Sequence, residues 1–192
     1  MIQIGDRLRS ARTVRDLNLR QLAEQTGLSA SMLCTIENGK SMPSVQSLAA
    51  IAKALGLPLG FFFEDENPAV PGLPVSTEGQ PAILGCPVVR KVARKEILLD
   101  GGITWQRLTP ASDPRSEFSE IIYEPGASSG PALYTHSGRE WGHVIQGELH
   151  VDLAYETYCL SVGDSITFDS QTPHRMRNAG SEVMRAIWVN LL

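Results

Sequence analysis

The chain has 192 residues, of which 42% are hydrophobic and 20% are charged, and its formal net charge is -4. This composition is ordinary for a globular protein with a hydrophobic core, and the length suits two small domains. No apolar run approaches the roughly 18 to 20 residues that cross a bilayer, and Met1 does not lead into a signal peptide. We therefore expect a cytoplasmic protein that does not contact a membrane.

The charge is divided unevenly along the chain. Residues 1–63 carry seven basic and four acidic side chains, a net charge of +3, whereas the remainder carries 10 basic and 17 acidic side chains, a net charge of -7. Only the first part is suited to a phosphate backbone, because affinity for DNA depends on neutralising phosphates.

The three cysteines, Cys34, Cys86 and Cys159, are odd in number and widely spaced. This spacing argues against a disulfide framework and against a zinc site built on cysteines. We expect reduced thiols that pack as small buried hydrophobes, with a redox-sensing thiol as the alternative. The sequence does not assign a role to any of them.

Five short helical segments are predicted within the first 63 residues. Apolar residues recur at three- and four-residue steps in the first segment, and the arginines there lie mostly off the buried face. Asn18 with Gln21 forms a capping box for the second helix, and Ser29 caps the third. The expected segments are residues 4–14, 19–27, 30–37, 44–56 and 58–63.

The second part of the chain is predicted to be all β. Proline, glycine and acidic residues mark 64–81 as a linker, since such a segment cannot bury enough apolar surface to fold alone. Beyond it, period-two runs bounded by turn residues favour a barrel or sandwich at residues 82–192. The expected strands are 97–99, 103–108, 118–123, 144–153, 166–168 and 183–189.

Residues 19–38 have the form of a helix-turn-helix, in which Ala23 lies where two helices cross and Gly27 makes the turn. The motifs Arg-Gln-Leu-Ala-Glu-Gln-Thr-Gly-Leu-Ser, Ile-Glu-Asn-Gly-Lys and Pro-Ser resemble the phage-repressor type of helix-turn-helix domain over nearly all of residues 4–60. The resemblance implies a sequence-specific transcriptional regulator that binds double-stranded DNA. Because one such domain touches few bases, it also implies a homodimer on two half-sites.

The same resemblance implies which side chains meet the DNA. Those expected at base edges are Ser29, Ala30, Ser31 and Thr35, and those expected near phosphates are Arg20, Asn38 and Lys40. Short side chains read bases less decisively than arginine or glutamine, so we expect direct readout to be aided by DNA shape. The alternative is that Ser29 and Asn38 only cap a helix and that Glu37 only pairs locally.

Two later segments resemble the two motifs of the cupin family, a small antiparallel jelly-roll barrel. The first runs from Pro125 through Tyr134-Thr-His136 and Glu140 to Gly147, and the second comprises Gly163-Asp164, Pro173-His174 and Asn178. The match covers roughly residues 84–192 and implies a domain that dimerises and senses a small effector.

Within this domain the resemblance implies a pocket formed by Tyr134, His136, Glu140 and His174. Two imidazoles and a carboxylate are a facial triad for a divalent metal such as zinc, iron or manganese. Tyr134 stands where the family usually has a further histidine, so a metal-free effector pocket and a purely structural cluster remain alternatives. His143 and His150 are expected to pack or to lie at the surface rather than to bind a metal.

A similar helical head and cupin tail occur in the hydroxypropylphosphonate epoxidase, an oxygen-dependent mononuclear non-haem iron enzyme with the same His-x-x-x-Glu spacing. Such an enzyme is the second function considered, and an antitoxin-like role with a protein partner is the third. The groove-facing and basic residues of the helical head favour the effector-responsive regulator, because an enzyme does not need them.

Overall fold

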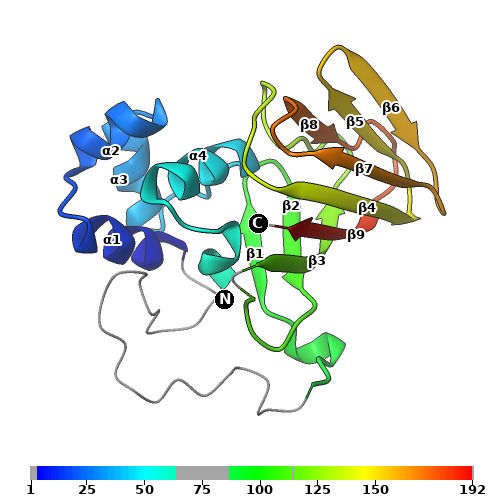
Figure 1. Ribbon diagram of the computed structural model, residues 1–192, viewed down its shortest axis with the longest axis horizontal. Helices are drawn as coiled ribbons and strands as arrows, with labels where there is room; N and C mark the ends of the chain where they lie inside the picture. The colour runs from blue at the N-terminus through cyan, green and yellow to red at the C-terminus, as the bar shows by residue number, and fades with distance from the viewer. Residues whose placement is uncertain (1–3, 64–86, 114, 192) are drawn as a thin grey trace.

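The structure is a computed structural model that describes residues 4–63, 87–113 and 115–191. Residues 4–63 form a helical domain, and the later described residues form a β-domain beside it (Figure 1). The predicted linker at 64–81 lies outside the described residues. Among the helices that the structure describes, none is long and apolar enough to cross a membrane.

Local signals in the sequence place the helices correctly. The Asn18 side chain accepts hydrogen bonds from the backbone of Arg20 and Gln21, which completes the predicted capping box. Gly27 and Gly56 end their helices in the left-handed conformation. The described helices are α1 (Ile4–Val14), α2 (Leu19–Thr26), α3 (Ala30–Glu37), α4 (Val45–Leu55) and η1 (Leu59–Phe63). The prediction of five helices is therefore corrected to four α-helices followed by a 3-10 helix.

Two arginines of α1 are used inside the helical domain rather than at its surface. Arg7 is buried, with its guanidinium 4.1 Å from the centre of the Phe61 ring, so it departs from the expected exposed face. Arg12 donates two hydrogen bonds to the buried Glu37 carboxylate, from its Nε at 2.6 Å and from a second nitrogen at 2.9 Å. Arg7 and Arg12 are therefore not among the side chains expected to meet a phosphate backbone.

The β-domain contains two antiparallel sheets. One has the strand order β1-β2-β3-β9-β4-β7 and the other has the order β6-β5-β8. The described strands are β1 (Glu96–Leu99), β2 (Ile103–Arg107), β3 (Ser116–Tyr123), β4 (Arg139–Gln146), β5 (Leu149–Leu153), β6 (Glu156–Leu160), β7 (Ser165–Asp169), β8 (His174–Arg177) and β9 (Met184–Leu191). The all-β architecture is as predicted, and the ladders among the described strands form two separate sheets rather than one closed sheet.

The strand prediction fails at the strands next to the candidate site. The run predicted as a single strand at 144–153 is two strands, β4 and β5, which are separated by Gly147 in a left-handed turn. The strands β6 and β8 were not predicted. Four of the five residues of β6 are exposed, so it has no apolar alternation to detect.

The two domains are joined by main-chain groups at both ends of the α4–η1 segment. The Gln46 N–H donates to the Ser129 carbonyl at 3.0 Å, and the Asp100 N–H donates to the Pro43 carbonyl at 2.9 Å. At the other end, the Gly60 N–H donates to the Glu117 carboxylate of β3. In Figure 1, α4 accordingly lies between the other helices and the sheets.

Asp152 on β5 accepts hydrogen bonds from Arg175 and Arg177 of strand β8, which also carries His174. Burial acts to raise the pKa of Asp152, but hydrogen bonds from Arg177, Thr157 and Arg175 outweigh it and hold the pKa well below its usual range. A depressed folded pKa gives stability that is present above the unfolded value and is lost as the pH falls toward the folded value.

We expect Asp152→Asn to lower the free energy of unfolding near neutral pH by about 2 kcal/mol, because it weakens charge-assisted hydrogen bonds. The variant should also lose less further stability than the parent below about pH 4, where an unfolded aspartate takes up a proton. Urea unfolding at a series of pH values measures both effects. Parallel pH curves for the two proteins would contradict the assignment.

Candidate metal site and adjoining cleft

The structure brings the four predicted pocket residues of the β-domain together. His136 lies just before β4, Glu140 lies on β4 and His174 begins β8. Glu140 Oε1 is 2.9 Å from His136 Nε2 and 3.2 Å from His174 Nε2. The Tyr134 ring centre is 4.4 Å from that of His174. Two sequence motifs therefore form one cluster, although Glu140 and His174 are 34 positions apart in the chain.

Hydrogen bonds orient both histidine rings toward Glu140. His136 Nδ1 lies 2.9 Å from the Ser137 carbonyl, and His174 Nδ1 lies 2.8 Å from the Thr172 carbonyl. A carbonyl accepts a hydrogen bond, so each Nδ1 carries the proton and each Nε2 is left with a lone pair or a second proton. In this arrangement a carbonyl holds Nδ1 and Nε2 points toward the other members of the cluster, which is typical of histidines that bind metals.

The cluster is electrostatically coupled. Burial acts to lower the pKa of His136, but its hydrogen bond to Glu140 and the Glu140 charge raise it. Burial acts to raise the pKa of Glu140, but the hydrogen bond from His136 and the charges of His174 and His136 lower it. Burial lowers the pKa of His174. An ionised carboxylate beside a neutral imidazole is the protonation state that a divalent metal requires.

Trp188 on β9 was not singled out by sequence analysis. Its indole N–H donates a 2.6 Å hydrogen bond to Glu140 Oε2, which leaves Oε1 facing the histidines. Gly142 makes room for the ring, because a Cβ at that position would lie 2.0 Å from it. The signal in the sequence was a glycine inside a strand, which often marks a close approach.

Tyr134 is not expected to serve as a metal ligand in place of the usual histidine. Burial raises the pKa of the Tyr134 phenol well above its ordinary value, so its hydroxyl is neutral. A neutral phenol is a weaker metal ligand than an imidazole, and the ring packs against His174. The candidate donor set is therefore three residues, His136, Glu140 and His174.

These three residues fit a divalent metal. Their donor atoms all lie within 4.8 Å of one another. His174 Nε2 is buried and lacks a hydrogen bond of good geometry, although Glu140 Oε1 lies only 3.2 Å away. Buried polar atoms normally have partners, so atoms that converge without one are what a metal site presents. Two nitrogens and one oxygen suit zinc, iron or manganese.

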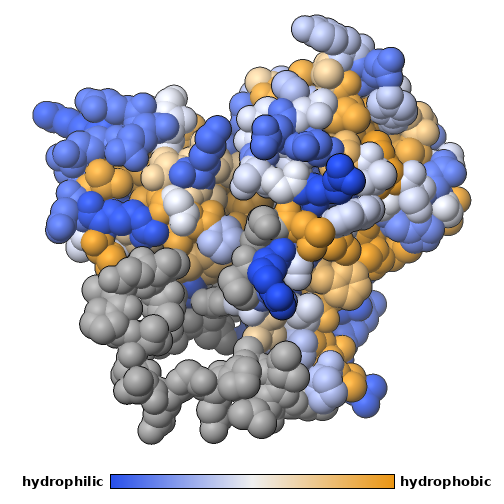
Figure 2. Space-filling view, viewed as in Figure 1, coloured by the Kyte–Doolittle hydropathy of each residue, from blue (hydrophilic) through white to orange (hydrophobic). Residues whose placement is uncertain are grey.

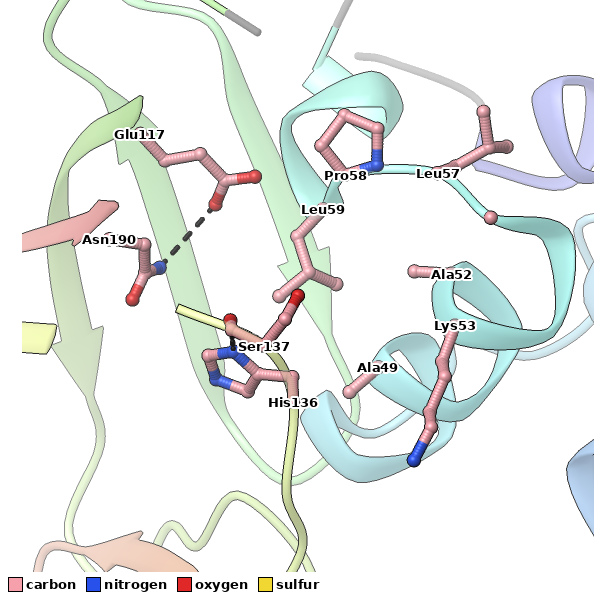
Figure 3. Close-up of a pocket in the computed structure, with 11 residues that line it drawn as sticks. Ala49, Ala52, Lys53, Leu57, Pro58, Leu59, Glu117, His136, Ser137 and Asn190 are labelled. Carbon is pink, nitrogen blue, oxygen red and sulfur yellow. Dashed lines mark hydrogen bonds between the residues drawn. The ribbon is translucent and has the colours of Figure 1, made fainter. Parts of the chain in front are cut away.

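A cleft of about 470 Å³ lies between the helical domain and this cluster, and its volume is typical of small-molecule sites. Figure 3 shows the two walls: α4 and η1 on one side, and His136, Glu117 and Asn190 on the other. The lining residues are Ala49, Ala52, Lys53, Gly56, Leu57, Pro58, Leu59, Glu117, His136, Ser137 and Asn190. Of the four predicted pocket residues, only His136 lines the cleft. The same side chain contacts the buried Glu140 carboxylate.

The helical wall of this cleft was missed because the sequence does not show how two domains pack. Ala49, Ala52 and Leu59 read as ordinary core positions, and Glu117 lies just before the strand predicted at 118–123. Burial is the largest influence on the pKa of Glu117 and raises it. The cleft is thus lined by apolar helical side chains, with the half-buried Glu117 on the facing strand.

The predicted DNA-contacting residues gather on α2, α3 and the turn after α3. Ser29 and Ser31 are exposed at the start of α3, whereas Ala30 and Thr35 are half-buried. Among the predicted phosphate contacts, Arg20, Asn38 and Lys40 are all exposed. Hydrophilic residues cover the outer end of the helical domain in Figure 2, away from the β-domain.

Ser29 and Asn38 also make the capping contacts considered as the alternative. The Ser29 hydroxyl accepts from the Met32 N–H at 3.1 Å. The Asn38 amide donates to the Cys34 carbonyl at 2.7 Å and accepts from Arg9 at 2.7 Å. Ser31, Arg20 and Lys40 are consequently the residues of this face with the most freedom to meet a ligand.

Comparison with known proteins identifies both domains. Residues 3–60 match the family model described as a helix-turn-helix domain, and residues 119–190 match the model described as a cupin domain. The chain is 28% identical over 188 residues to the HTH-type transcriptional regulator PuuR of Escherichia coli, covering 95% of this chain and 91% of that protein. It is also 28% identical over 179 residues to the HTH-type transcriptional regulator SutR of Escherichia coli, covering 92% and 88%.

A solved structure has the same two-part arrangement. The crystal structure of an HTH_3 family transcriptional regulator from Vibrio cholerae aligns with a TM-score of 0.68 and 24% identity, covering 100% of this chain and 96% of that chain. This likeness concerns the fold, because the identity is low. The sequence matches extend over both domains and their junction.

Proposed function

We propose that this chain, whose two parts match a helix-turn-helix domain and a cupin domain and which is similar over most of its length to HTH-type transcriptional regulators, binds an operator in double-stranded DNA as a homodimer. We further propose that a small molecule held at the cupin domain controls this binding. The observation that carries the second proposal is the cleft whose walls come from both domains. A protein of this kind acts where the DNA is, which in bacteria is the cytoplasm.

The start of α3 is the proposed base-contacting surface. Ser29, Ala30, Ser31 and Thr35 would face the major groove, and Arg20, Asn38 and Lys40 would lie near phosphates. Support comes from the exposure of Ser31, Arg20 and Lys40 on one hydrophilic side of the domain. Short groove-facing side chains predict that DNA shape contributes to specificity.

The outer face of the six-stranded sheet is the proposed dimer surface. Phe118, Val189 and Trp141 are consecutive partners across β3, β9 and β4, so their side chains share a face. Phe118 and Trp141 are exposed, as is Ile145 further along β4. Apolar residues gather over this part of the surface in Figure 2. A second copy would cover this patch and place two heads on two half-sites.

The proposed metal ligands are His136, Glu140 and His174, with zinc, iron or manganese as candidates. When bound, the metal would offer open coordination positions to a ligand. His136 would hold the metal from one side and contact an effector in the cleft from the other. A single residue would then connect the buried centre with the wall of the helical domain.

The cleft provides a direct route from effector to DNA. A ligand that touches both walls stabilises the domain arrangement in which those contacts exist, and it destabilises others by comparison. Because α4 packs against α2, which in turn packs against α3, a small shift of α4 would change the position of the DNA-contacting surface. A coupling of only about 1 to 3 kcal/mol alters DNA affinity by roughly 5- to 150-fold.

The non-haem iron enzyme is not the function advanced here. PuuR and SutR, which are similar to this chain over most of its length, are transcriptional regulators. The DNA-facing residues of the helical domain, which an enzyme does not need, point the same way.

Fluorescence anisotropy tests DNA binding. The purified protein is titrated against the duplex upstream of its own gene, against duplexes selected by the protein from genomic fragments, and against scrambled duplexes, at two salt concentrations. We expect a preference of about a thousandfold for the operator, with affinity that falls as salt rises. Equal and weak binding to all duplexes would reject the regulator.

Filling the cleft tests effector control. Ser137 lines the cleft from the β-domain and is exposed, so Ser137→Trp adds bulk without disturbing a core. We expect this variant to bind the operator yet to lose the change in affinity that cellular metabolite fractions cause in the parent. Ser181→Trp, at an exposed serine outside the cleft, should keep the response. A full response in Ser137→Trp would place the effector elsewhere.

A further inference from the structure

A second cluster of metal-ligating side chains lies on the hairpin formed by β5 and β6. His150 on β5 is the direct cross-strand partner of Cys159 on β6. Glu148 lies in the turn just before β5, and its carboxylate contacts the His150 ring. The hairpin thus unites residues that the sequence spacing had appeared to separate, and it reopens the question of a cysteine-containing metal site.

The three donor atoms converge on one another. His150 Nε2 is 2.8 Å from Glu148 Oε1 and 3.8 Å from Cys159 Sγ, and all three atoms lie within 4.8 Å. In a catalytic relay the carboxylate and the thiol would contact opposite nitrogens of the ring. Here both contact the same nitrogen, which does not fit a relay but is compatible with three donors around one ion.

We propose that Glu148, His150 and Cys159 form a second divalent-metal site, distinct from the cupin cluster and suited to zinc. Zinc bonds of about 2.0 to 2.3 Å in a tetrahedron place neighbouring donor atoms roughly 3.3 to 3.6 Å apart. The observed separations of 2.8 and 3.8 Å bracket that range. A mixed sulfur, nitrogen and oxygen donor set is one that zinc accepts.

The site lies at the surface. Cys159 is exposed, which corrects the expectation that each cysteine packs as a buried hydrophobe, and Cys34 is half-buried. Cys86 lies outside the described residues. The Glu148 side chain is 46% exposed and also borders a shallow cavity of about 360 Å³. The fourth coordination position is therefore open to water or to a ligand from solvent, and the metal can exchange.

The two sites differ in chemistry and in location. His150 lies on the outward side of β5, between the buried Leu149 and Val151. The cupin cluster contains nitrogen and oxygen donors only, whereas this cluster contains a thiolate. A sulfur signature from a bound metal therefore reports on the hairpin site alone, whatever occupies the cupin cluster.

Cobalt(II) titration of the full chain tests the proposal, because cobalt(II) replaces zinc and gives a thiolate-to-metal charge-transfer band in the near ultraviolet. The Cys34→Ser/Cys86→Ser background leaves Cys159 as the sole thiol. We expect this protein to show the band, zinc to abolish the band by displacing cobalt, and Cys159→Ser to lack it. His174→Ala, which alters the cupin cluster, should keep the band.

The other two ligands are tested by affinity. His150→Ala and Glu148→Gln should each weaken cobalt binding by more than about 10-fold. A loss of that size follows even when a residue that only hydrogen-bonds to a metal ligand is removed. His143→Ala, at an exposed histidine on β4, should change nothing. A band that is absent from the parent, or affinity unchanged in both ligand variants, would overturn the proposal. Circular dichroism checks that every variant is folded.

Discussion

Ser31→Glu is expected to reduce operator affinity by about 100-fold or more in the anisotropy assay. Ser31 is exposed in the first turn of α3, where the helix would enter the groove. A carboxylate there faces phosphates, and juxtaposed like charges cost several kcal/mol, at roughly 1.4 kcal/mol for each tenfold in affinity. The proposed homodimer would carry the change twice.

Loss of folding would not explain this result. A negative charge in the first turn of a helix is favourable to the helix, so Ser31→Glu should not lower the melting temperature. Ser161→Glu makes the same change at an exposed serine between β6 and β7. We expect it to retain operator affinity. If both variants bind alike, α3 does not enter the groove.

Arg12→Ala is expected to destabilise the helical domain by about 3 kcal/mol, the scale of breaking a buried ion pair. The Glu37 side chain is only 3% exposed, and Arg12 holds both of its oxygens. The same guanidinium donates to the Leu17 carbonyl at 2.8 Å. Removing it leaves a buried carboxylate with one long contact, to Arg9 at 3.5 Å. Urea unfolding measures the loss.

Arg9→Ala is the matched comparison within the same cluster. The Arg9 side chain is 48% exposed, so its ion pair is screened by solvent. We expect a loss of less than about 1 kcal/mol, as is usual for surface pairs. Equal losses in the two variants would mean that Glu37 is held by other groups. Operator affinity should fall with stability in Arg12→Ala, because Glu37 ends the α3 helix.

The helical domain was predictable because its signals are local. Asn18, Ser29 and Gly27 mark helix ends through bonds within a few residues, and the structure places the ends there. The final helical piece differs only in type. The burial of Arg7 was not predictable, because it depends on Phe61, which lies 54 positions away.

The β-domain was predictable in class but not in strand pairing. Alternating apolar residues revealed the strands that have a buried face, such as β2. The strand β6 lacks such a face, and the turn at Gly147 was hidden inside a continuous run. The pairing of His150 with Cys159 could not be predicted, because it depends on the turn at Gly147 and on strand β6, and neither was predicted.

The candidate site was predicted through its motifs and not through its surroundings. The spacing of His136, Glu140 and His174 resembles a known pattern, and the structure brings the three together. Trp188 orients Glu140 from a strand that carries no motif. The helical wall of the cleft depends on how two domains dock, which no local pattern encodes.

The joint between the domains uses main-chain atoms on the helical side throughout. Gln46, Pro43 and Gly60 contribute an N–H, a carbonyl and an N–H, respectively. Every residue except proline has both groups, so most substitutions at Gln46 leave its bond intact. Under the proposed function, substitutions can therefore change the lining of the cleft, and with it the effector that binds, while the hydrogen bonds between the domains persist. Ligand specificity could then evolve through the side chains of the cleft while the connection between the two domains stays the same.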